Sequence, residues 1–228
     1  MSNATTTPER LKNAVTKKWP EAICSLARRY TLYFPTGFAA LDALFPCGRG
    51  IPYGQLIEIT GRTSSGKTSL LLRLLGANTA GDRSVAYVDF NDTFFPDAAL
   101  AAGVDAKRLV VIKIPAVQHV SDGLRAAELL LRDRHADIVV FDLVGRHTPL
   151  PLGLLHRLRL RAVRARGLVV FLTEGHEPPT PQPDTLIPSS MTSLRLEVQR
   201  ADINAGRLQV TVTKSRLCPE GLQVELEL

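Results

Sequence analysis

The chain has 228 residues, 45% of them hydrophobic and 22% charged, which suits one large α/β domain with a short extension. Its three cysteines are far apart and form no CxxC pair. This argues against a zinc site or a disulfide framework and favours reduced thiols in a cytoplasmic protein. No run approaches about 20 apolar residues, and the opening MSNATTTPER has no apolar stretch, so we expect neither a membrane span nor a secretory signal.

Positive charge is concentrated near the N-terminus. The formal net charge is +6, and residues 1–35 hold six Lys or Arg against two Glu. A basic excess of this kind is compatible with nucleic acid or with an acidic protein surface. Helix-start signals at Thr7-Pro8-Glu9 and Pro20-Glu21 predict two helices here. We therefore predict a basic helical extension over residues 1–35 and a single α/β domain over residues 36–228.

Strands and helices are expected to alternate through the middle of the chain. After a short helix at 38–42 and a turn at 46–50, the predicted strands are Gln55–Thr60, Ser84–Phe90, Leu109–Ile114, Ile138–Asp142 and Leu168–Thr173. The predicted helices are Lys67–Gly76, Pro96–Ala102, Val120–Arg134 and Leu152–Arg166. This alternation predicts a mostly parallel sheet with helices on both faces. The apolar runs at 85–88, 110–112, 138–141 and 169–172 are typical of strands covered on both sides.

The C-terminal part follows a different pattern. Residues 193–199, 206–214 and 221–228 alternate apolar and polar side chains, and short turns containing Gly206 and Gly221 connect them. These segments are expected to form antiparallel strands at the end of the sheet. The segment 175–189 contains five prolines without a helical or strand period, so a long loop is predicted there.

A phosphate-binding loop is the strongest motif in the sequence. The segment GRTSSGKT follows a predicted strand and opens a predicted helix, as a Walker A loop does. Its backbone N–H groups and the helix N-terminus would face phosphate oxygens, Lys67 would reach the β- and γ-phosphates, and Thr68 would bind Mg²⁺. We expect ATP or ADP with Mg²⁺ to bind at Gly61, Arg62, Thr63, Ser64, Ser65, Gly66, Lys67 and Thr68.

Carboxylates at two strand ends are candidates for the metal and for catalysis. Asp142 ends a buried strand in the position of a Walker B acid, where it would hold Mg²⁺; the alternative is an acid that caps a turn. Asp89 and Asp92 follow the second strand and are candidates for the base that polarises water, or else they too only cap the turn.

A stripe of arginines follows one side of the helix predicted over 152–166. Arg157, Arg161 and Arg164 are spaced so that they lie together, and like charges at this spacing repel one another. An anionic partner such as the DNA backbone would relieve that repulsion, whereas the simpler interpretation is a solvated helix face.

Several segments of the sequence resemble the RecA recombinase core. The resemblance covers about residues 36–228. It is carried by PTGFAALDALFPCGRGIPYGQLIEITGRTSSGKT, by Tyr87-Val88-Asp89 running through Phe95-Pro96 to Ala102-Gly103-Val104-Asp105, and by Lys214-Ser215-Arg216. It implies a RecA-like fold in which Lys214 and Arg216 reach the nucleotide of a neighbouring subunit, and hence self-association. The separate C-terminal domain of RecA is expected to be absent.

Within this superfamily, TGFAALDAL followed by a glycine-containing turn resembles ImuA, the RecA-like family of the bacterial damage-induced mutagenesis cassette. The resemblance implies work in translesion synthesis, in the cytoplasm or near the nucleoid. The implied partners are an ImuB-like polymerase relative, an error-prone polymerase assembly, and RecA.

Several positions depart from the RecA pattern. The catalytic Glu of the family falls on Asn91, which cannot accept a proton, and the residue that stacks on adenine falls on Ala98. The switch Gln falls on Glu174, whose charge would repel a γ-phosphate. The DNA-binding loop falls on 175–189, which has two acids and no Lys or Arg.

Three functions are compatible with this combination. The first is an accessory or regulatory protein that binds ATP with weak or no hydrolysis and docks on protein partners. The second is an active DNA-stimulated ATPase or recombinase in which Asp89 or Asp92 replaces the missing Glu. The third is a module that caps or bridges RecA filaments through residues 1–35.

Overall fold

A computed structural model describes residues 32–114, 120–146, 149–175, 186–202 and 206–228. The helices predicted at the N-terminus and most of the predicted loop at 175–189 lie outside these residues. Within the described residues, no helix combines the length and the apolar character needed to cross a membrane, and no three His, Cys, Asp or Glu side chains group as a metal site.

One eight-stranded sheet organises the chain, in the order β10-β9-β8-β3-β7-β6-β4-β5. All neighbouring pairs from β8 to β5 are parallel, while β9 and β10 continue the sheet antiparallel, as the sequence predicts. The parallel strands are β3 (Leu56–Gly61), β4 (Val85–Asp89), β5 (Leu109–Lys113), β6 (Ile138–Asp142), β7 (Leu168–Glu174) and β8 (Leu194–Asp202). The antiparallel strands are β9 (Arg207–Ser215) and β10 (Gln223–Glu227).

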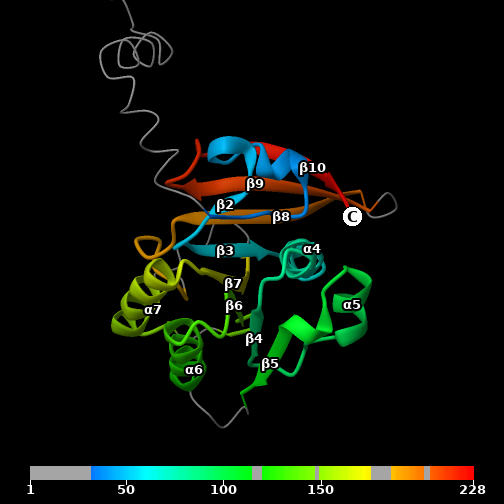
Figure 1. Cartoon of the computed structure of the whole chain (residues 1–228). Coiled ribbons are helices and arrows are strands. Elements are labelled where there is room, and N and C mark those ends of the chain that lie inside the picture. Colours follow the sequence, from blue (N-terminus) through cyan, green and yellow to red (C-terminus); the bar gives the residue numbers. More distant parts are fainter. Residues whose placement is uncertain (1–31, 115–119, 147–148, 176–185, 203–205) are drawn as a thin grey trace, which may run out of the picture.

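Helices cover both faces of this sheet (Figure 1). On one side lie α4 (Lys67–Thr79) and α5 (Pro96–Ala101), and on the other lie α6 (Val120–Arg132) and α7 (Leu152–Ala165). The shorter elements are β1 (Tyr33–Phe34), α3 (Ala39–Asp42), η1 (Pro46–Gly48), β2 (Ile51–Pro52) and η2 (Ala106–Arg108). β1 and β2 pair as a separate antiparallel ribbon.

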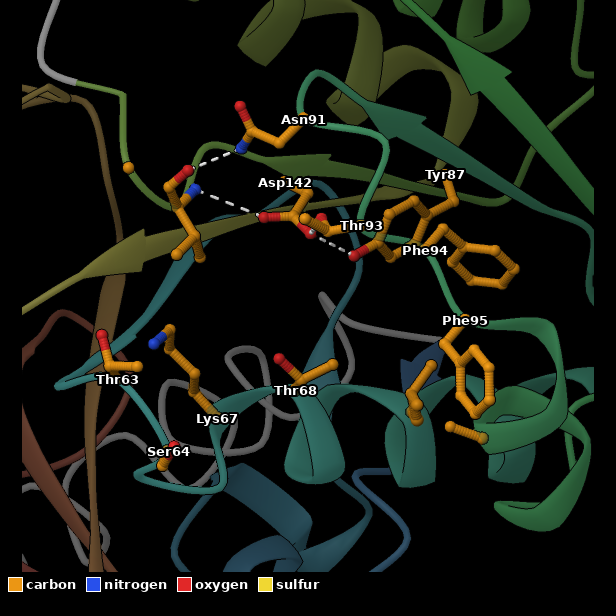
Figure 2. Close-up of a pocket in the computed structure, with 14 residues that line it drawn as sticks. Thr63, Ser64, Lys67, Thr68, Tyr87, Asn91, Thr93, Phe94, Phe95 and Asp142 are labelled. Atoms are coloured by element: carbon orange, nitrogen blue, oxygen red, sulfur yellow. Dashed lines mark hydrogen bonds between the residues drawn. The ribbon is translucent and has the colours of Figure 1, made fainter.

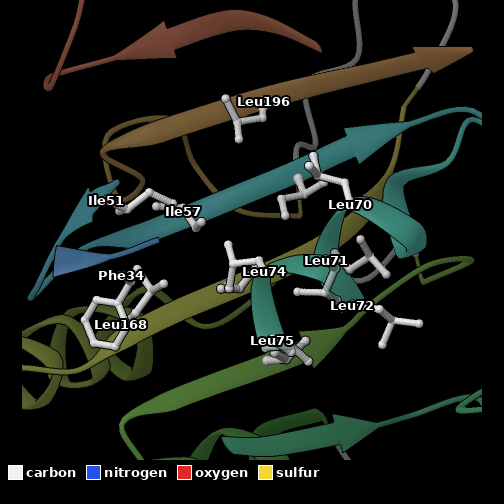
Figure 3. Close-up of a cluster of buried hydrophobic side chains, with 14 of the residues drawn as sticks. Phe34, Ile51, Ile57, Leu70, Leu71, Leu72, Leu74, Leu75, Leu168 and Leu196 are labelled. Carbon is white, nitrogen blue, oxygen red and sulfur yellow. The ribbon is translucent and has the colours of Figure 1, made fainter. Parts of the chain in front are cut away.

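Side chains that alternate along the strands divide the hydrophobic core into two clusters, one on each face of the sheet. Successive side chains of β3 point to opposite faces, so Ile57 packs in the cluster that contains α4, while Leu56 packs in the cluster that contains α6 and α7. Figure 3 shows Leu70, Leu71 and Leu74 of α4 near Ile57. These contacts fix the start of α4 at the end of β3, where the Walker A loop lies.

β5 differs from its predicted environment. Its apolar run indicated a strand covered on both faces, but β5 is the edge strand of the sheet, and Val110 is 58% exposed. The prediction that helices cover both faces of this strand is therefore wrong. An apolar run in the sequence does not show whether its strand lies inside the sheet or at the edge.

A buried ion pair crosses the middle of the sheet. The Glu58 carboxylate on β3 accepts hydrogen bonds from Arg195 Nε of β8 at 2.7 Å and from Thr173 Oγ1 of β7 at 2.9 Å. The Glu58 side chain is 8% exposed and that of Arg195 is 22% exposed. Desolvation makes such a pair sensitive to the loss of either partner.

We expect Arg195→Met to lower the free energy of unfolding by about 3 kcal/mol, because it leaves the buried Glu58 carboxylate without its cation. Urea denaturation measures this change. The double variant Glu58→Met/Arg195→Met should recover most of the loss, since it also removes the stranded charge. A double variant as unstable as the single one would contradict this interpretation.

Candidate nucleotide-binding site

The Walker A loop joins β3 to α4 through two left-handed residues, Ser64 and Gly66, with φ of 61° and 92°. A Cβ at Gly66 would lie 2.4 Å from Leu208 Cδ2, and one at Gly61 would lie 2.4 Å from the Val198 carbonyl oxygen. Gly61 therefore needs glycine because the backbone of β8 lies against it, and Gly66 needs glycine chiefly because of its positive φ. No side chain caps the N-terminus of α4, so its backbone N–H groups stay available to an anion.

An open pocket of about 420 Å³ lies over this loop (Figure 2). The loop supplies Thr63, Ser64, Lys67 and Thr68 to its wall. The other lining residues are Leu72, Tyr87, Asn91, Thr93, Phe94, Phe95, Ala98, Asp142, Val144 and Gly145. The structure thus brings Lys67, Thr68, Asp142 and Asn91, all predicted from the sequence, to one pocket.

Lys67 provides positive charge at this pocket. Its side chain is largely buried, and Nζ donates a hydrogen bond to the Arg62 carbonyl oxygen at 3.1 Å. Burial lowers the pKa of Lys67, and the carboxylates of Glu174 and Asp142 act in the opposite direction. A partly desolvated ammonium beside an uncapped helix N-terminus fits a phosphate group.

Asp142 faces Lys67 and Thr68 across the pocket (Figure 2). Its Oδ2 accepts hydrogen bonds from Tyr87 Oη at 2.6 Å and from Thr93 Oγ1 at 3.3 Å, and its Oδ1 accepts one from the Val144 N–H at 3.3 Å. These donors fix the carboxylate at the end of β6. A carboxylate opposite a threonine hydroxyl is a donor set that suits Mg²⁺, which takes few protein ligands and completes its shell with phosphate and water.

The two aspartates proposed as bases both have partners at the turn after β4. The buried Asp89 carboxylate accepts hydrogen bonds from the backbone N–H groups of Asn91, Thr93 and Phe94, at 3.0, 3.2 and 2.9 Å. Asp89 therefore caps the turn. Asp92 forms an ion pair with Lys113, and both aspartates line a second pocket. Neither residue lines the pocket over the Walker A loop.

Asn91 does line that pocket, but both halves of its amide are engaged. Nδ2 donates to the Val144 carbonyl oxygen at 2.6 Å, and Oδ1 accepts from Arg146 Nε at 3.1 Å. Arg146 also donates to the Phe90 carbonyl oxygen at 2.6 Å, which anchors the guanidinium. The amide is therefore fixed between the loop after β6 and the turn after β4.

Glu174 reaches the Walker A loop from the end of β7. Its Oε1 accepts a hydrogen bond from Thr63 Oγ1 at 2.7 Å. The carboxylate at this strand end therefore accepts a hydrogen bond from a threonine of the Walker A loop.

The apolar end of the pocket contains residues that the sequence did not single out. Ala98 offers no ring, but Phe95, three residues earlier and 62% exposed, lines the same pocket with Phe94 and Leu72. Tyr87 and Thr93, which hold Asp142, were also missed as site residues. The aromatic pair directly before Pro96 is the signal that could have indicated Phe95, because the turn after a parallel strand faces the ligand edge of such sheets.

Lys214 and Arg216 lie away from this pocket. Lys214 stands opposite Arg195 at the start of β8, near the amino end of β3, whereas the Walker A loop follows its carboxyl end. Lys214 Nζ donates to the Thr192 carbonyl oxygen at 2.7 Å, and Arg216 donates to that of Ser190 at 2.8 Å. Burial lowers the pKa of Lys214, and the nearby charges of Arg216 and Arg195 add to this effect.

The arginine stripe on α7 has an internal partner. Glu128 of α6 pairs with Arg157 at 3.2 Å and with Arg161 at 3.4 Å. Part of the repulsion expected along the stripe is therefore relieved within the chain.

Comparison with known proteins relates this geometry to a family. The family model of the RecA N-terminal domain matches residues 18–151. The chain is 29% identical to Protein RecA of Francisella tularensis subsp. novicida (strain U112), and 29% identical to Protein RecA of F. tularensis subsp. tularensis (strain SCHU S4 / Schu 4). Each alignment covers 85% of this chain and 62% of the relative, so the chain spans less than two thirds of these proteins.

The hydrogen bond between Tyr87 and Asp142 gives a pH-dependent prediction. Burial raises the pKa of Tyr87 far above its ordinary value of 10.0, and the carboxylates of Asp142 and Asp89 add to this shift. The unfolded chain therefore loses the phenol proton first. The contribution of the protonated Tyr87 to the free energy of unfolding is fully present below pH 10, the ordinary pKa of tyrosine, and declines as the pH rises above it.

We expect Tyr87→Phe to lower the free energy of unfolding by about 1–2 kcal/mol at neutral pH, because the buried carboxylate loses its shortest donor. Urea denaturation at several pH values should give a constant difference from wild type up to about pH 9 and a shrinking difference above about pH 10. A difference that widens in that alkaline range would contradict the assignment.

Proposed function

Because the chain belongs to the RecA N-terminal domain family, whose model matches more than half of it, we propose that it is a RecA-like accessory protein that binds ATP or ADP with weak or no hydrolysis. Its proposed role is regulatory, in DNA-damage-induced mutagenesis by translesion synthesis. There it docks on an ImuB-like polymerase relative, on RecA, or on both. The TGFAALDAL segment, which resembles ImuA, supports this narrower assignment.

The main support for this proposal is the amide side chain of Asn91. The RecA resemblance assigns this residue to the position of the family's catalytic Glu, and its amide nitrogen and oxygen each have a partner, on Val144 and Arg146 respectively. An amide cannot accept a proton from water. Asp89 caps its own turn and Asp92 pairs with Lys113, so Asp142 is the one carboxylate among the described residues that line the pocket. The means of binding phosphate are kept without a free base to activate water.

The residues around the pocket have distinct roles in the proposed complex. The first backbone N–H groups of α4 and the Lys67 ammonium would hold the phosphates, while Thr68 and Asp142 would hold Mg²⁺. When bound, Mg²⁺ neutralises phosphate charge. Tyr87 and Thr93 keep Asp142 oriented for this task. At the apolar end, Phe95 would provide the aromatic surface for the base that Ala98 cannot.

Self-association, or capping of a RecA filament, is a second candidate function. Lys214 and Arg216 lie near the amino end of β3, so they would meet a nucleotide only if it belonged to another subunit. This arrangement is compatible with the role that the RecA resemblance implies for them. The recombinase alternative receives less support, because its replacement bases do not line the pocket.

Direct titration with fluorescent ATP and Mg²⁺ tests the nucleotide site. We expect Lys67→Ala to weaken binding about 100-fold, because a charge-assisted contact to phosphate is lost, and Phe95→Ala to weaken it about tenfold through lost stacking. Lys107→Ala serves as the matched control, since Lys107 is exposed and lies outside the pocket.

Thermal unfolding without nucleotide verifies that each variant folds. Binding by Lys67→Ala that equals wild type would refute the site. A loss in Phe95→Ala without one in Lys67→Ala would place the ligand elsewhere in the pocket.

A further inference from the structure

The outer face of α7 combines unpaired positive charge with exposed apolar side chains. The helix carries Arg157, Arg159, Arg161 and Arg164 and contains no Asp or Glu. With four positive charges in 14 residues, it is far more basic than the chain as a whole, whose net charge is +6. It lies on the face of the sheet opposite α4 and contributes no residue to the nucleotide pocket.

The inward and outward faces of α7 are clearly separated. Leu155, Leu158 and Ala162 are buried against the sheet. On the outside, Leu152, Leu160 and Val163 are 58%, 46% and 49% exposed. Together with the exposed His156, these positions are spaced four, four and three residues apart, so they form one continuous row along the helix. We call this row the α7 outer row.

Charges flank the outer row on both sides, and only some of them are neutralised. Glu128 of α6 pairs with Arg157 and Arg161. Within the described part of the chain, no ion pair reaches Arg159 or Arg164. Arg164 is exposed and Arg159 is half-buried beside the row. A partner would therefore meet leucines and a valine bordered by free guanidinium groups.

We propose that the α7 outer row docks an acidic amphipathic helix of a partner protein, which lays its apolar side chains on Leu152, Leu160 and Val163 and its carboxylates on Arg159 and Arg164. In helix–helix recognition of this kind, apolar side chains at helical spacing provide most of the contact, and flanking charges determine which partner binds. The inference rests on the partner docking proposed above, but not on nucleotide binding.

The observations favour a protein partner over nucleic acid at this surface. A phosphate backbone would neutralise the arginines but leave the leucines exposed to water. An acidic amphipathic helix covers both kinds of side chain.

Fluorescence anisotropy with the full chain and two designed probes tests this proposal. One probe is an amphipathic peptide with leucines at helical spacing flanked by Glu, and the other has Lys in place of every Glu. We expect the Glu peptide to bind and the Lys peptide not to bind. Arg159→Glu/Arg164→Glu and Leu152→Ser/Leu160→Ser should each weaken binding of the Glu peptide about tenfold or more, whereas Arg49→Glu/Arg200→Glu, matched in charge and exposed elsewhere, should not.

Two further measurements separate the outcomes. Binding of single-stranded DNA of about 20 nucleotides is measured with the same variants, since a phosphate-binding surface would respond to the arginine changes but not to the leucine changes. The proposal would be overturned if the Glu peptide did not bind or if the Lys peptide bound equally well. It would also be overturned if DNA bound and its binding responded to the arginine changes but not to the leucine changes. Nucleotide titration of the same proteins reports on the Walker A site independently, so its failure would leave the α7 result standing.

Discussion

The packing of the Walker A loop against β8 and β9 sets the geometry of the site. Gly61 lies against the Val198 backbone with no room for a Cβ, and Gly66, which has a φ of 92°, lies against the Leu208 side chain. This close approach joins the parallel core to the antiparallel end of the sheet. It also fixes the start of α4, because Gly66 adopts the left-handed conformation directly before Lys67. The orientation of Lys67, Thr68 and the helix N-terminus therefore depends on β8 and β9, which come much later in the chain.

The carboxyl ends of β4 and β6 carry aspartates with different tasks. They are neighbours in the sheet, since Asp89 pairs in register with Asp142. Backbone N–H groups surround the Asp89 carboxylate, which makes it part of the turn. Side-chain hydroxyls hold the Asp142 carboxylate, which remains at the pocket wall. Between them, Asn91 links the turn after β4 to the loop after β6 through Val144 and Arg146. These contacts hold Asn91 at the wall of the pocket in which we propose that nucleotide binds.

The sequence was sufficient for features that depend on local pattern. The Walker A loop, the end of β6 at Asp142 and the alternation of strands and helices follow from glycine spacing and apolar runs. Features that depend on distant partners could not be predicted. The pairing of Glu128 with Arg157 and Arg161 joins two helices, and the edge position of β5 depends on strand order. The capping role of Asp89 and the ion pair between Asp92 and Lys113 depend on the geometry of the turn. In that turn Asp92 adopts a left-handed conformation with a φ of 56°.

ATP turnover by the purified chain, with and without single-stranded DNA, distinguishes nucleotide binding without hydrolysis from a working ATPase. Phosphate release is measured at saturating ATP and Mg²⁺, with Lys67→Ala as the background. We predict that wild type binds nucleotide yet releases phosphate at a rate close to that of this variant, whether or not DNA is present. Turnover that DNA stimulates and that Lys67→Ala abolishes would contradict the account, because it would require a working base in a pocket where Asn91 is fixed by Val144 and Arg146.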